Sequence, residues 1–594
     1  MKIQILSSRA DGRFAVAGAV SGNGRTNTLL AAVAGGLHAV AFGGPPLWWL
    51  ELLALALLVW RAGRAPGPWA AARLGWAFGL GWFGVGVNWV FISMHEYGGM
   101  HPALAGAATA LFCGFLALFP ALATGAWTAL LGRGAARGGF VAVVSFGALW
   151  GATEWLRGWI FTGFPWIGSG LAHVEGPLAG WLPVIGQNTV NAVCGFVAAA
   201  LVALVESPGA RFESGHGAVT RPIFGRSSTG GSGFGASLGA RFTSRGGAHF
   251  GAGGGAGTLG GGATRLAAPL IALALLGGGM ALTGHAWTTP VGEALRVRLV
   301  QGNVAQDMKF APEHLAAQLA TYARLAGVDQ PVVGLAPQLI VMPETAIPVL
   351  MPEVEPAWIQ ALQDHAARTD ATVLTGVPLV EVLTPDARAV SYFNSVIALD
   401  ADSRWTVNPA RGGQRYDKHH LVPFSEFIPF GFRWFVDAMV MPLDDFTAGA
   451  AVQPPLKVRD QLVGPNVCYE DLFGAEIAAR FHRPDQPDAT LLLNVSNLAW
   501  FDDSAALPQH LLASRARALE TGRPMLRATN TGMTAIVGPD GRVQAQLAPL
   551  TEGVLDGSVQ GMTGLTPYTR IGDAPLLVLG AFTLMLLRLR RRVS

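Results

Sequence analysis

Long apolar segments dominate the N-terminal half of this chain and constrain its fold more than any other feature. A helix needs about 20 mostly apolar residues to span a bilayer, and the first two segments are short for that length. Only 13% of the residues are charged, whereas average soluble proteins carry about 25%. The pattern predicts a polytopic α-helical membrane domain of about eight transmembrane helices, at roughly 28–43, 46–62, 71–94, 102–131, 140–159, 183–205, 266–284 and 574–588.

The arginines between these segments predict how the helices are oriented. Basic residues gather in alternate loops, at 61–73, 132–138 and 206–265, and in the C-terminal sequence RLRRRVS. This alternation fits the positive-inside rule with both chain ends in the cytoplasm. The polar block 292–570 then lies on the outer face, which is the periplasmic side of a bacterial inner (cytoplasmic) membrane.

Two segments are predicted to lie outside any packed core. Residues 1–27 carry no long apolar run and no cleavage-site pattern, so they are expected to form a cytoplasmic tail and not a signal peptide. Residues 206–264 consist mainly of Gly, Ser, Ala and Arg, a composition that cannot bury enough apolar surface to fold. We expect a disordered cytoplasmic linker there, between helices 1–6 (28–205) and helix 7 (265–285), with helix 8 at 573–590.

From Ala294 onward, short β-type runs alternate with amphipathic helical patterns. Such a mixture over about 270 residues predicts one layered α/β domain at 292–570. The block 292–570 has no GxGxxG or P-loop motif and no basic patch interleaved with aromatics, which argues against nucleotide cofactors and nucleic acid. The expected strands are 295–304, 338–344, 371–380, 394–400 and 489–497, and the expected helices are 312–327, 356–369 and 507–522.

Cys468 is the only cysteine in this polar block, and it lies where an apolar run meets a helical pattern. At such a junction the helix N–H groups and dipole are expected to lower the thiol pKa, which favours a nucleophile. The alternative is a small buried core residue. No metal-ligand cluster is expected, because the adjacent His419 and His420 cannot share one face of a helix or strand.

Acyl transfer at a cysteine needs a general base and an oxyanion stabiliser. Glu344 ends the apolar run LIVMPE and suits a general base. Lys418 can stabilise an oxyanion, and Glu426 follows it by eight residues. Each also has an ordinary explanation. Glu344 would be a helix N-cap, Lys418 a solvated charge and Glu426 a surface carboxylate. Arg157 falls at the predicted outer face, where it is either a functional charge or a snorkelling side chain.

The order Glu, Lys, Cys, each at the end of an apolar strand, resembles the nitrilase (carbon–nitrogen hydrolase) superfamily. That resemblance implies an αββα sandwich. Seven spans before the domain and one after it resemble the apolipoprotein N-acyltransferase family within it. The matching motifs are LVQGNV (299–304), VMPETAIP (341–348), YDKHHLVPFSEFIP (416–429), VCYEDLFG (467–474), SNLAWF (496–501), RALETGRPMLRATNTG (517–532), GLTPYTR (564–570), GFPW (163–166) and EGPLAGWLPVIG (175–186).

The resemblance implies a ping-pong reaction and assigns the residues that carry it. Cys468 would take an acyl chain from the sn-1 position of a phospholipid such as phosphatidylethanolamine, giving a thioester. Glu344 would act as general base, and Lys418 would stabilise the tetrahedral intermediates. The α-amine of the N-terminal diacylglyceryl-cysteine of a bacterial apolipoprotein would then attack the thioester. A monomer without metal or other cofactor is expected.

Further residues match family positions around this triad. The expected supporting residues are Asn394, Glu426, Tyr469 and Glu470, and the candidate substrate contacts are Arg157, Phe310 and Trp500. The chain departs from the family pattern at Phe310, where many relatives have Trp, and at Leu498, where an acid is usual. Replacing Trp by Phe keeps an aromatic ring but loses the indole N–H donor.

Two other functions were weighed. A membrane-anchored nitrilase-type amidase would use the same triad on a small C–N bond, but a soluble substrate does not require seven spans. A transporter with a non-catalytic outer domain would need ionisable residues at mid-membrane, and Glu51 and Glu154 lie near predicted span boundaries. The acyltransferase is therefore the preferred prediction.

Overall fold

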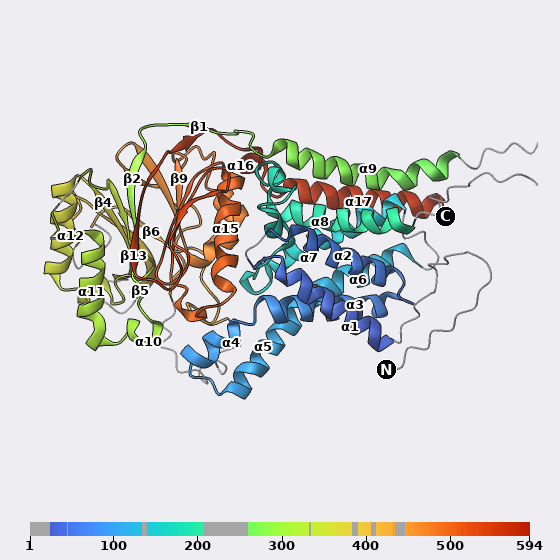
Figure 1. Cartoon of the computed structure of the whole chain (residues 1–594), viewed down its shortest axis with the longest axis horizontal. Coiled ribbons are helices and arrows are strands. Elements are labelled where there is room, and N and C mark those ends of the chain that lie inside the picture. The colour runs from blue at the N-terminus through green and yellow to red at the C-terminus, as the bar shows by residue number, and fades with distance from the viewer. Residues whose placement is uncertain are drawn as a thin grey trace, which may run out of the picture.

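A computed structural model describes residues 24–593 apart from 44–45, 133–138, 207–258, 329, 332–333, 383–389, 406–411, 430, 432 and 434–445; the side chains of 259–265 and 593 are also outside the description. Most of the predicted N-terminal tail and almost all of the predicted linker lie outside the described residues. Figure 1 shows a helical bundle at one end of the molecule and an α/β domain at the other. The first described helix begins at Gly24 and the last ends at Val593, both at the end of the bundle that is farthest from the α/β domain.

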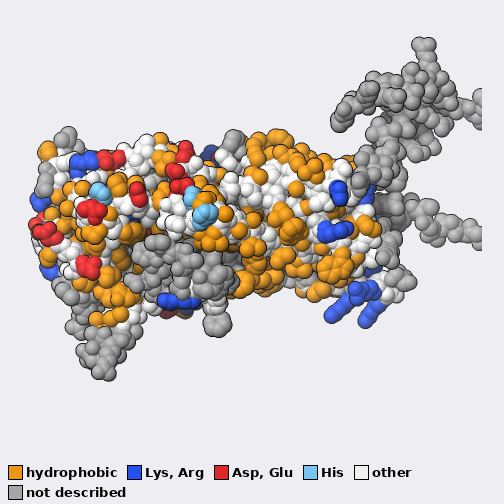
Figure 2. All heavy atoms as spheres, turned by 90° about the horizontal axis from the view of Figure 1, so that it is seen from below, with side chains coloured by type: hydrophobic (Ala, Val, Ile, Leu, Met, Phe, Trp, Pro, Cys, Tyr) orange, Lys and Arg blue, Asp and Glu red, His pale blue; other side chains and the backbone are white. Residues whose placement is uncertain are grey.

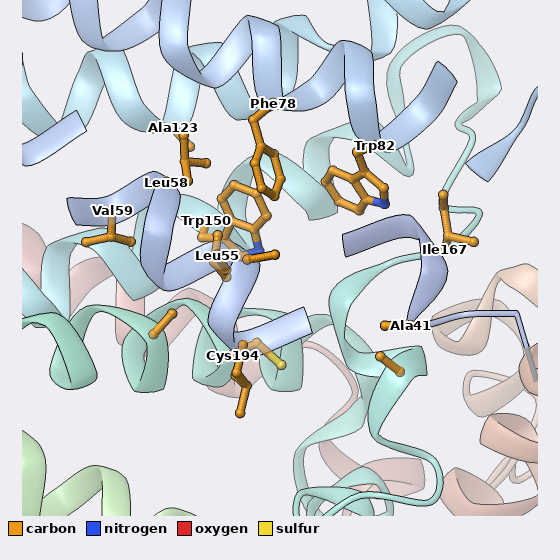
Figure 3. Packing of buried hydrophobic residues seen from close by; sticks show 14 of the residues in the cluster. Ala41, Leu55, Leu58, Val59, Phe78, Trp82, Ala123, Trp150, Ile167 and Cys194 are labelled. Carbon is orange, nitrogen blue, oxygen red and sulfur yellow. The ribbon is translucent and has the colours of Figure 1, made fainter. Parts of the chain in front are cut away.

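Each predicted apolar segment forms helix. Large aromatic side chains fill the centre of the bundle, where Phe78, Trp82 and Trp150 are completely buried (Figure 3). The outward faces carry exposed apolar side chains such as Leu29 and Leu111. The helices are α1 (Gly24–Val40), α2 (Trp48–Gly63), α3 (Pro68–Gly86), α5 (Pro102–Leu116), α6 (Leu118–Leu131), α7 (Phe140–Arg157), α8 (Leu182–Glu206), α9 (Leu259–Leu282) and α17 (Ala574–Val593).

The structure divides one predicted segment more sharply than the sequence pattern suggested. The apolar run 71–94 leaves α3 at Gly86 and continues into α4 (Val90–Ile92) and a π-helical turn, η1 (Ser93–Tyr97), with a bend of 62°. Among the described residues, Pro102–Leu131 and Ala179–Glu206 are long and apolar enough to cross a membrane, and the bent pair would make a third. The eight-span topology therefore stays a prediction.

In the described part of the α/β domain, two six-stranded sheets face each other. The three central strands of each sheet run parallel and the outer strands antiparallel. The first sheet has the order β13 (Gly553–Val559), β2 (Leu295–Gln301), β3 (Leu339–Val341), β4 (Thr372–Val382), β5 (Val390–Leu399), β6 (Arg415–Asp417). The second has the order β12 (Val543–Gln546), β11 (Ala535–Val537), β10 (Met525–Thr529), β9 (Leu491–Ser496), β8 (Gln461–Val467), β7 (Leu456–Val458).

Helices cover the outer face of each sheet and complete the predicted αββα sandwich (Figure 1). Helices α11 (Pro312–Ala326) and α12 (Pro356–Thr369) pack on the first sheet, and α15 (Ala506–Thr521) packs on the second. Parallel strands buried on both faces explain the near-continuous apolar runs in the sequence. Because α15 also contacts α8, the second sheet is joined to the bundle through this helix.

The bundle also buries charged groups that the sequence placed near span boundaries. Glu51 on α2 is completely buried, and its carboxylate lies 3.3 Å from Nε2 of His173 and 3.8 Å from Nδ1 of His38. The Glu154 carboxylate lies 3.2 Å from the guanidinium of Arg157. Charges in an apolar bundle are tolerated where they pair with one another. The Glu51 contacts join α2 to α1 and to the turn at Ser169–His173, whereas Glu154 and Arg157 pair within α7.

Candidate active site

The three predicted catalytic residues meet where the two sheets face each other. Glu344 lies just beyond β3, Lys418 directly follows β6, and Cys468 directly follows β8. The Nζ atom of Lys418 lies 3.4 Å from Oε1 of Glu344, and the charges of both residues act on the Cys468 thiol. Cys468 keeps some exposure, as a residue that must reach a substrate requires.

Two of the predicted supporting residues hold the carboxylate and the ammonium in place. The Asn394 amide donates one hydrogen bond to Oε1 of Glu344 (2.8 Å) and another to Oε1 of Glu426 (2.7 Å). The Lys418 ammonium donates to Glu426 as well (2.9 Å). The second oxygen of Glu344 accepts the backbone N–H of Asn497 (2.8 Å). The acid–base groups are thus fixed before any substrate arrives.

The prediction of a helix-lowered thiol pKa is wrong. Cys468 starts a five-residue 3₁₀ turn, η7 (Cys468–Leu472), with a positive φ of 49°, and not the α-helix that the prediction assumed. Burial raises the pKa of the Cys468 thiol, and the negative charge of Glu344 raises it further, against the opposing charge of Lys418. The thiol is therefore protonated at rest and needs a base to become a nucleophile.

The Lys418 side chain stays charged because neighbouring carboxylates offset the effect of its burial. Burial alone would lower the pKa of Lys418, but the carboxylates of Glu426 and Glu344 raise it above its ordinary value. A permanently charged, water-excluded ammonium is suited to stabilise negative charge that develops on a reacting carbonyl oxygen.

Glu470 connects the two segments that carry Lys418 and Cys468. Its buried carboxylate accepts the backbone N–H groups of His419 (2.9 Å) and His420 (3.1 Å) on one side and of Val467 (2.6 Å) on the other. The Tyr416 hydroxyl donates to the same carboxylate (2.9 Å). This carboxylate fixes the spacing between the ammonium and the nucleophile.

Tyr469 joins the nucleophile turn to the helical bundle. Its hydroxyl donates to the backbone oxygen of Gly163 (2.6 Å) in the segment after α7, and its ring lies near those of Phe164 and Phe473. His420 makes a second link to this segment, 2.9 Å from the backbone oxygen of Thr162. The active-site turn therefore rests directly on the bundle.

Arg157 does not line this site. Its side chain is 2% exposed, and its guanidinium donates to the backbone oxygens of Phe164 (2.5 Å) and Trp166 (2.9 Å) and pairs with Glu154. These contacts leave no open face for a phospholipid headgroup. The arginine instead fixes the shape of the segment on which Tyr469 rests.

The two aromatic candidate contacts lie at the rim. Phe310 is half-exposed after the short helix α10 (Gln306–Lys309). Trp500 lies in the turn η8 (Ala499–Phe501), with its ring centroid 6.1 Å from that of Tyr97. Tyr97 ends η1, so the bent helix of the bundle reaches this rim. Leu498 is buried, so the residue in place of the usual acid contributes to packing.

Sequence reasoning missed Lys309 and His510. The buried Lys309 donates to the backbone oxygen of Glu344 (3.1 Å), and Nε2 of His510 lies 3.0 Å from the backbone oxygen of Cys468. Arg527 in turn donates to Nδ1 of His510 (2.5 Å). Neither residue has a spacing signal, although the helical pattern at 507–522 could have placed His510 on the sheet-facing side.

No metal-ligand cluster was expected from the sequence, but among the described residues one group of side chains has the geometry to hold a metal ion. The ligand atoms of Glu51, His173 and Cys194 lie within 4.8 Å of one another inside the bundle. They are separate from the Cys468 site, and Glu51 already pairs with His173. The group is therefore distinct from the cluster formed by Glu344, Lys418 and Cys468.

The fold and the site define a carbon–nitrogen hydrolase domain joined to a helical membrane-type bundle. The carbon–nitrogen hydrolase family model matches residues 296–568, and the model of the apolipoprotein N-acyltransferase N-terminal domain matches residues 34–200.

Curated relatives match over almost the whole chain. An apolipoprotein N-acyltransferase of Ralstonia nicotianae is 43% identical, covering 95% of this chain and 93% of the relative. Those of Bordetella bronchiseptica (39% identical; 92% and 94% covered) and Chromobacterium violaceum (38%; 94% and 93%) are similar too. The chain belongs to the apolipoprotein N-acyltransferase family.

Proposed function

We propose that this protein transfers an acyl chain from the sn-1 position of a phospholipid, such as phosphatidylethanolamine, to the α-amine of the N-terminal diacylglyceryl-cysteine of apolipoproteins. The observation that carries the proposal is the placement of Cys468. Its thiol is beside a fixed carboxylate and a fixed ammonium, and its turn rests on an apolar helical bundle. Lipid substrates require this combination of acyl chemistry and membrane contact.

In the first half-reaction, Glu344 removes the thiol proton and the sulfur of Cys468 attacks the ester carbonyl carbon. The carbonyl oxygen becomes an oxyanion that the Lys418 ammonium stabilises. When the intermediate collapses, the C–O ester bond breaks and Glu344 returns the proton to the departing lysophospholipid hydroxyl. The enzyme is left with a thioester on Cys468.

In the second half-reaction, the amine of the diacylglyceryl-cysteine attacks the thioester carbonyl. Glu344 accepts a proton from the attacking nitrogen, and Lys418 again stabilises the oxyanion. The C–S bond breaks, an amide bond remains on the lipoprotein, and the sulfur of Cys468 regains a proton from Glu344. Asn394, Glu426, Glu470 and Tyr469 serve as positioning residues in both halves.

The proposal includes the arrangement in the membrane. The helices at 28–205, 265–285 and 573–590 would span the inner membrane eight times, with the 292–570 domain in the periplasm and the protein acting as a monomer. Basic side chains support this orientation, because they gather at the end of the bundle opposite the α/β domain (Figure 2). There Arg61 bonds to Asn27 and Arg64 pairs with Glu206, as cytoplasmic helix ends would.

The intact mass of the full chain after incubation with phosphatidylethanolamine vesicles tests the proposal. We expect one acyl adduct on the wild type that hydroxylamine removes, and no adduct on Cys468→Ala. The serine variant of a bundle cysteine, Cys113→Ser, is the matched control and should acylate normally. An unmodified wild type in lipid would contradict the acyl-enzyme mechanism.

The same experiment separates the amidase alternative. A hydrolytic enzyme would release free fatty acid continuously without an amine acceptor. A transferase should stop after one acyl group per chain until an acceptor is added.

A further inference from the structure

The chain contains only four lysines, Lys2, Lys309, Lys418 and Lys457. Lysine side chains are almost never fully buried unless they are paired. Nevertheless Lys309 is 2% and Lys418 is 1% exposed, and both contact Glu344. By contrast, Lys457 points out from the edge strand β7. A chain so poor in lysine thus places two of its four ammonium groups around one carboxylic acid.

Lys309 holds the backbone on which Glu344 is mounted. Its ammonium donates to the carbonyl oxygen of Glu344 (3.1 Å). That carbonyl belongs to the peptide bond leading into Thr345, whose φ of 45° is unfavourable for a β-branched residue. A conformation of this kind persists only where neighbouring contacts enforce it, and the ammonium of Lys309 supplies such a contact.

The same short helix, α10, also helps to fix the carboxylate of Glu344, through Asn497. In α10, the Gln306 side chain accepts a hydrogen bond from the Asn497 amide (2.8 Å), and the backbone N–H of Asn497 donates to Oε2 of Glu344 (2.8 Å). Helix α10 is itself tied to α11, because Gln318 donates to the backbone oxygen of Met308 (2.7 Å). The base is therefore held at its backbone and at its carboxylate from one element.

Lys309 also affects the balance between the buried negative and positive charges of the site. In the part of the chain that the structure describes, the carboxylates of Glu344 and Glu426 both pair with one ammonium, that of Lys418. A protonated Lys309 would balance the second carboxylate in a site where an uncompensated charge is costly. The titratable groups that act on Lys309 are Glu344, at the end of β3, and the Cys468 thiol, at the end of β8. Asp307 lies on α10 itself.

We propose that Lys309 is a positioning residue of this active site, whose charged ammonium fixes the backbone of the general base Glu344 and compensates the buried negative charge beside the nucleophile. This inference deepens the proposed acyl-transfer function and rests on it. Burial lowers the pKa of Lys309 to about 8, against the opposing charges of Glu344 and Cys468. The charged form is therefore available at neutral pH and is lost in mildly alkaline solution.

The test compares Lys309→Met, Lys309→Arg and the matched surface control Lys457→Met in the full-length protein. The readout is the rate of thioester formation with phosphatidylethanolamine vesicles, followed by intact mass. At pH 7, we expect Lys309→Met to be slower by about 10- to 100-fold, the usual cost of losing an outer group that orients a reactive one. Lys309→Arg should recover part of the rate, and Lys457→Met should match the wild type.

The pH profile separates a charged role from simple packing. Because the protonated lysine is the functional form, the advantage of the wild type over Lys309→Met should be complete below pH 8 and disappear as the pH rises through about 8. Lys309→Arg should keep its rate to higher pH, because arginine does not deprotonate in this range. This comparison of wild type with Lys309→Arg decides the matter even if Lys309→Met does not fold.

Two results would overturn the inference. One is thioester formation by Lys309→Met at the wild-type rate. The other is a loss of rate in Lys309→Met that is the same at every pH. Either result leaves the proposed function standing as long as the wild type forms the thioester. If the wild type itself forms no adduct, it is the proposed function that fails.

Discussion

At the residue scale, the site places a protonated thiol, that of Cys468, beside the fixed carboxylate of Glu344, the proposed base. Burial and Glu344 raise the pKa of Cys468, so the thiol is inert until a proton acceptor is in line. The Asn394 amide and the Asn497 backbone occupy both oxygens of Glu344, which leaves the carboxylate little freedom to turn away. A protonated thiol is a weak nucleophile. In the proposed reaction, the thiol therefore reacts only when Glu344 removes its proton.

Replacing Glu344 with Gln tests the base directly. Glutamine keeps the size of the side chain but cannot accept the thiol proton, and general-base catalysis contributes typically about 10²- to 10⁴-fold. We expect thioester formation to slow by that amount, measured as the time course of the acyl adduct. Glu381→Gln, on the partly exposed end of β4, is the control. A near-wild-type rate for Glu344→Gln would remove this residue from the mechanism.

Glu426 affects the reaction through Lys418. Glu426→Gln removes the largest of the charges that raise the pKa of the Lys418 ammonium, while the amide can still meet Asn394. We expect an ammonium that is held less firmly in the position where the oxyanion forms, and a rate lower by about 10-fold or more. Rates on a thioester substrate and on phospholipid should fall together, because both steps pass through an oxyanion. A loss confined to one step would contradict this role.

At the element scale, the segment between α7 and η3 (Ser169–His173) is the support for the nucleophile turn. Arg157 fixes its backbone from within, and Tyr469 and His420 bond to it from the α/β domain. Helix α15 adds a second link, because Gln509 accepts hydrogen bonds from Trp89 (3.2 Å) and Trp166 (2.8 Å). The two halves of the molecule therefore share polar contacts as well as an apolar core.

The Arg157→Met variant shows whether Arg157 stabilises the fold or binds a phospholipid headgroup. In Arg157→Met, the Glu154 carboxylate would be left buried and unpaired, which typically costs about 3–5 kcal/mol. We expect a clear drop in melting temperature and in activity, with no change in preference among phospholipid headgroups. A variant of unchanged stability that loses only its headgroup preference would restore the headgroup contact expected from the sequence.

Tyr469→Phe tests the docking of the nucleophile turn. The change removes the hydroxyl that donates to Gly163 and leaves a buried carbonyl unsatisfied, at a cost of about 1–3 kcal/mol. We expect slower thioester formation and a lower melting temperature, measured side by side. Tyr392→Phe, on a partly exposed position of β5, should change neither, and an unaffected Tyr469→Phe would show that the link to the bundle is dispensable.

The elements themselves were largely predictable, but their connections were not. Apolar runs and period-two alternation located the helices and strands, and the strand ends carried Glu344, Lys418 and Cys468 as expected. The break after Gly86 was missed because 71–94 is mostly apolar, and the single Asn88 beside the break is a weak signal. The thiol environment was wrong because it depends on a 3₁₀ turn and on charges from distant strands. Lys309 acquires its partner Glu344 only through a tertiary contact between residues 35 positions apart, which no local pattern encodes.

At the scale of the whole molecule, the bundle and the sandwich form one elongated body (Figure 1), and the turn that carries Cys468 contacts the bundle through Tyr469. The face of the bundle seen in Figure 2 carries many apolar side chains, and basic side chains gather at its far end. The proposed orientation therefore sets the active site at the outer edge of the bilayer, within reach of phospholipid esters and of a membrane-tethered amine.

Protease protection checks this orientation. In right-side-out inner-membrane vesicles, we expect added protease to cut the 292–570 domain while an epitope placed after Arg592 stays protected. Inverted vesicles should give the opposite pattern. Protection of the α/β domain in right-side-out vesicles would reverse the proposed topology.

The most direct test of the central claim is discharge of the isolated acyl-enzyme. Wild-type protein would be acylated with phosphatidylethanolamine, separated from the phospholipid, and mixed with a diacylglyceryl-modified lipopeptide that has a free N-terminal amine. The account predicts loss of the adduct from Cys468 and gain of the same acyl mass on the lipopeptide, resistant to hydroxylamine as an amide is. Discharge to free fatty acid, or an adduct that persists beside the amine, would contradict it.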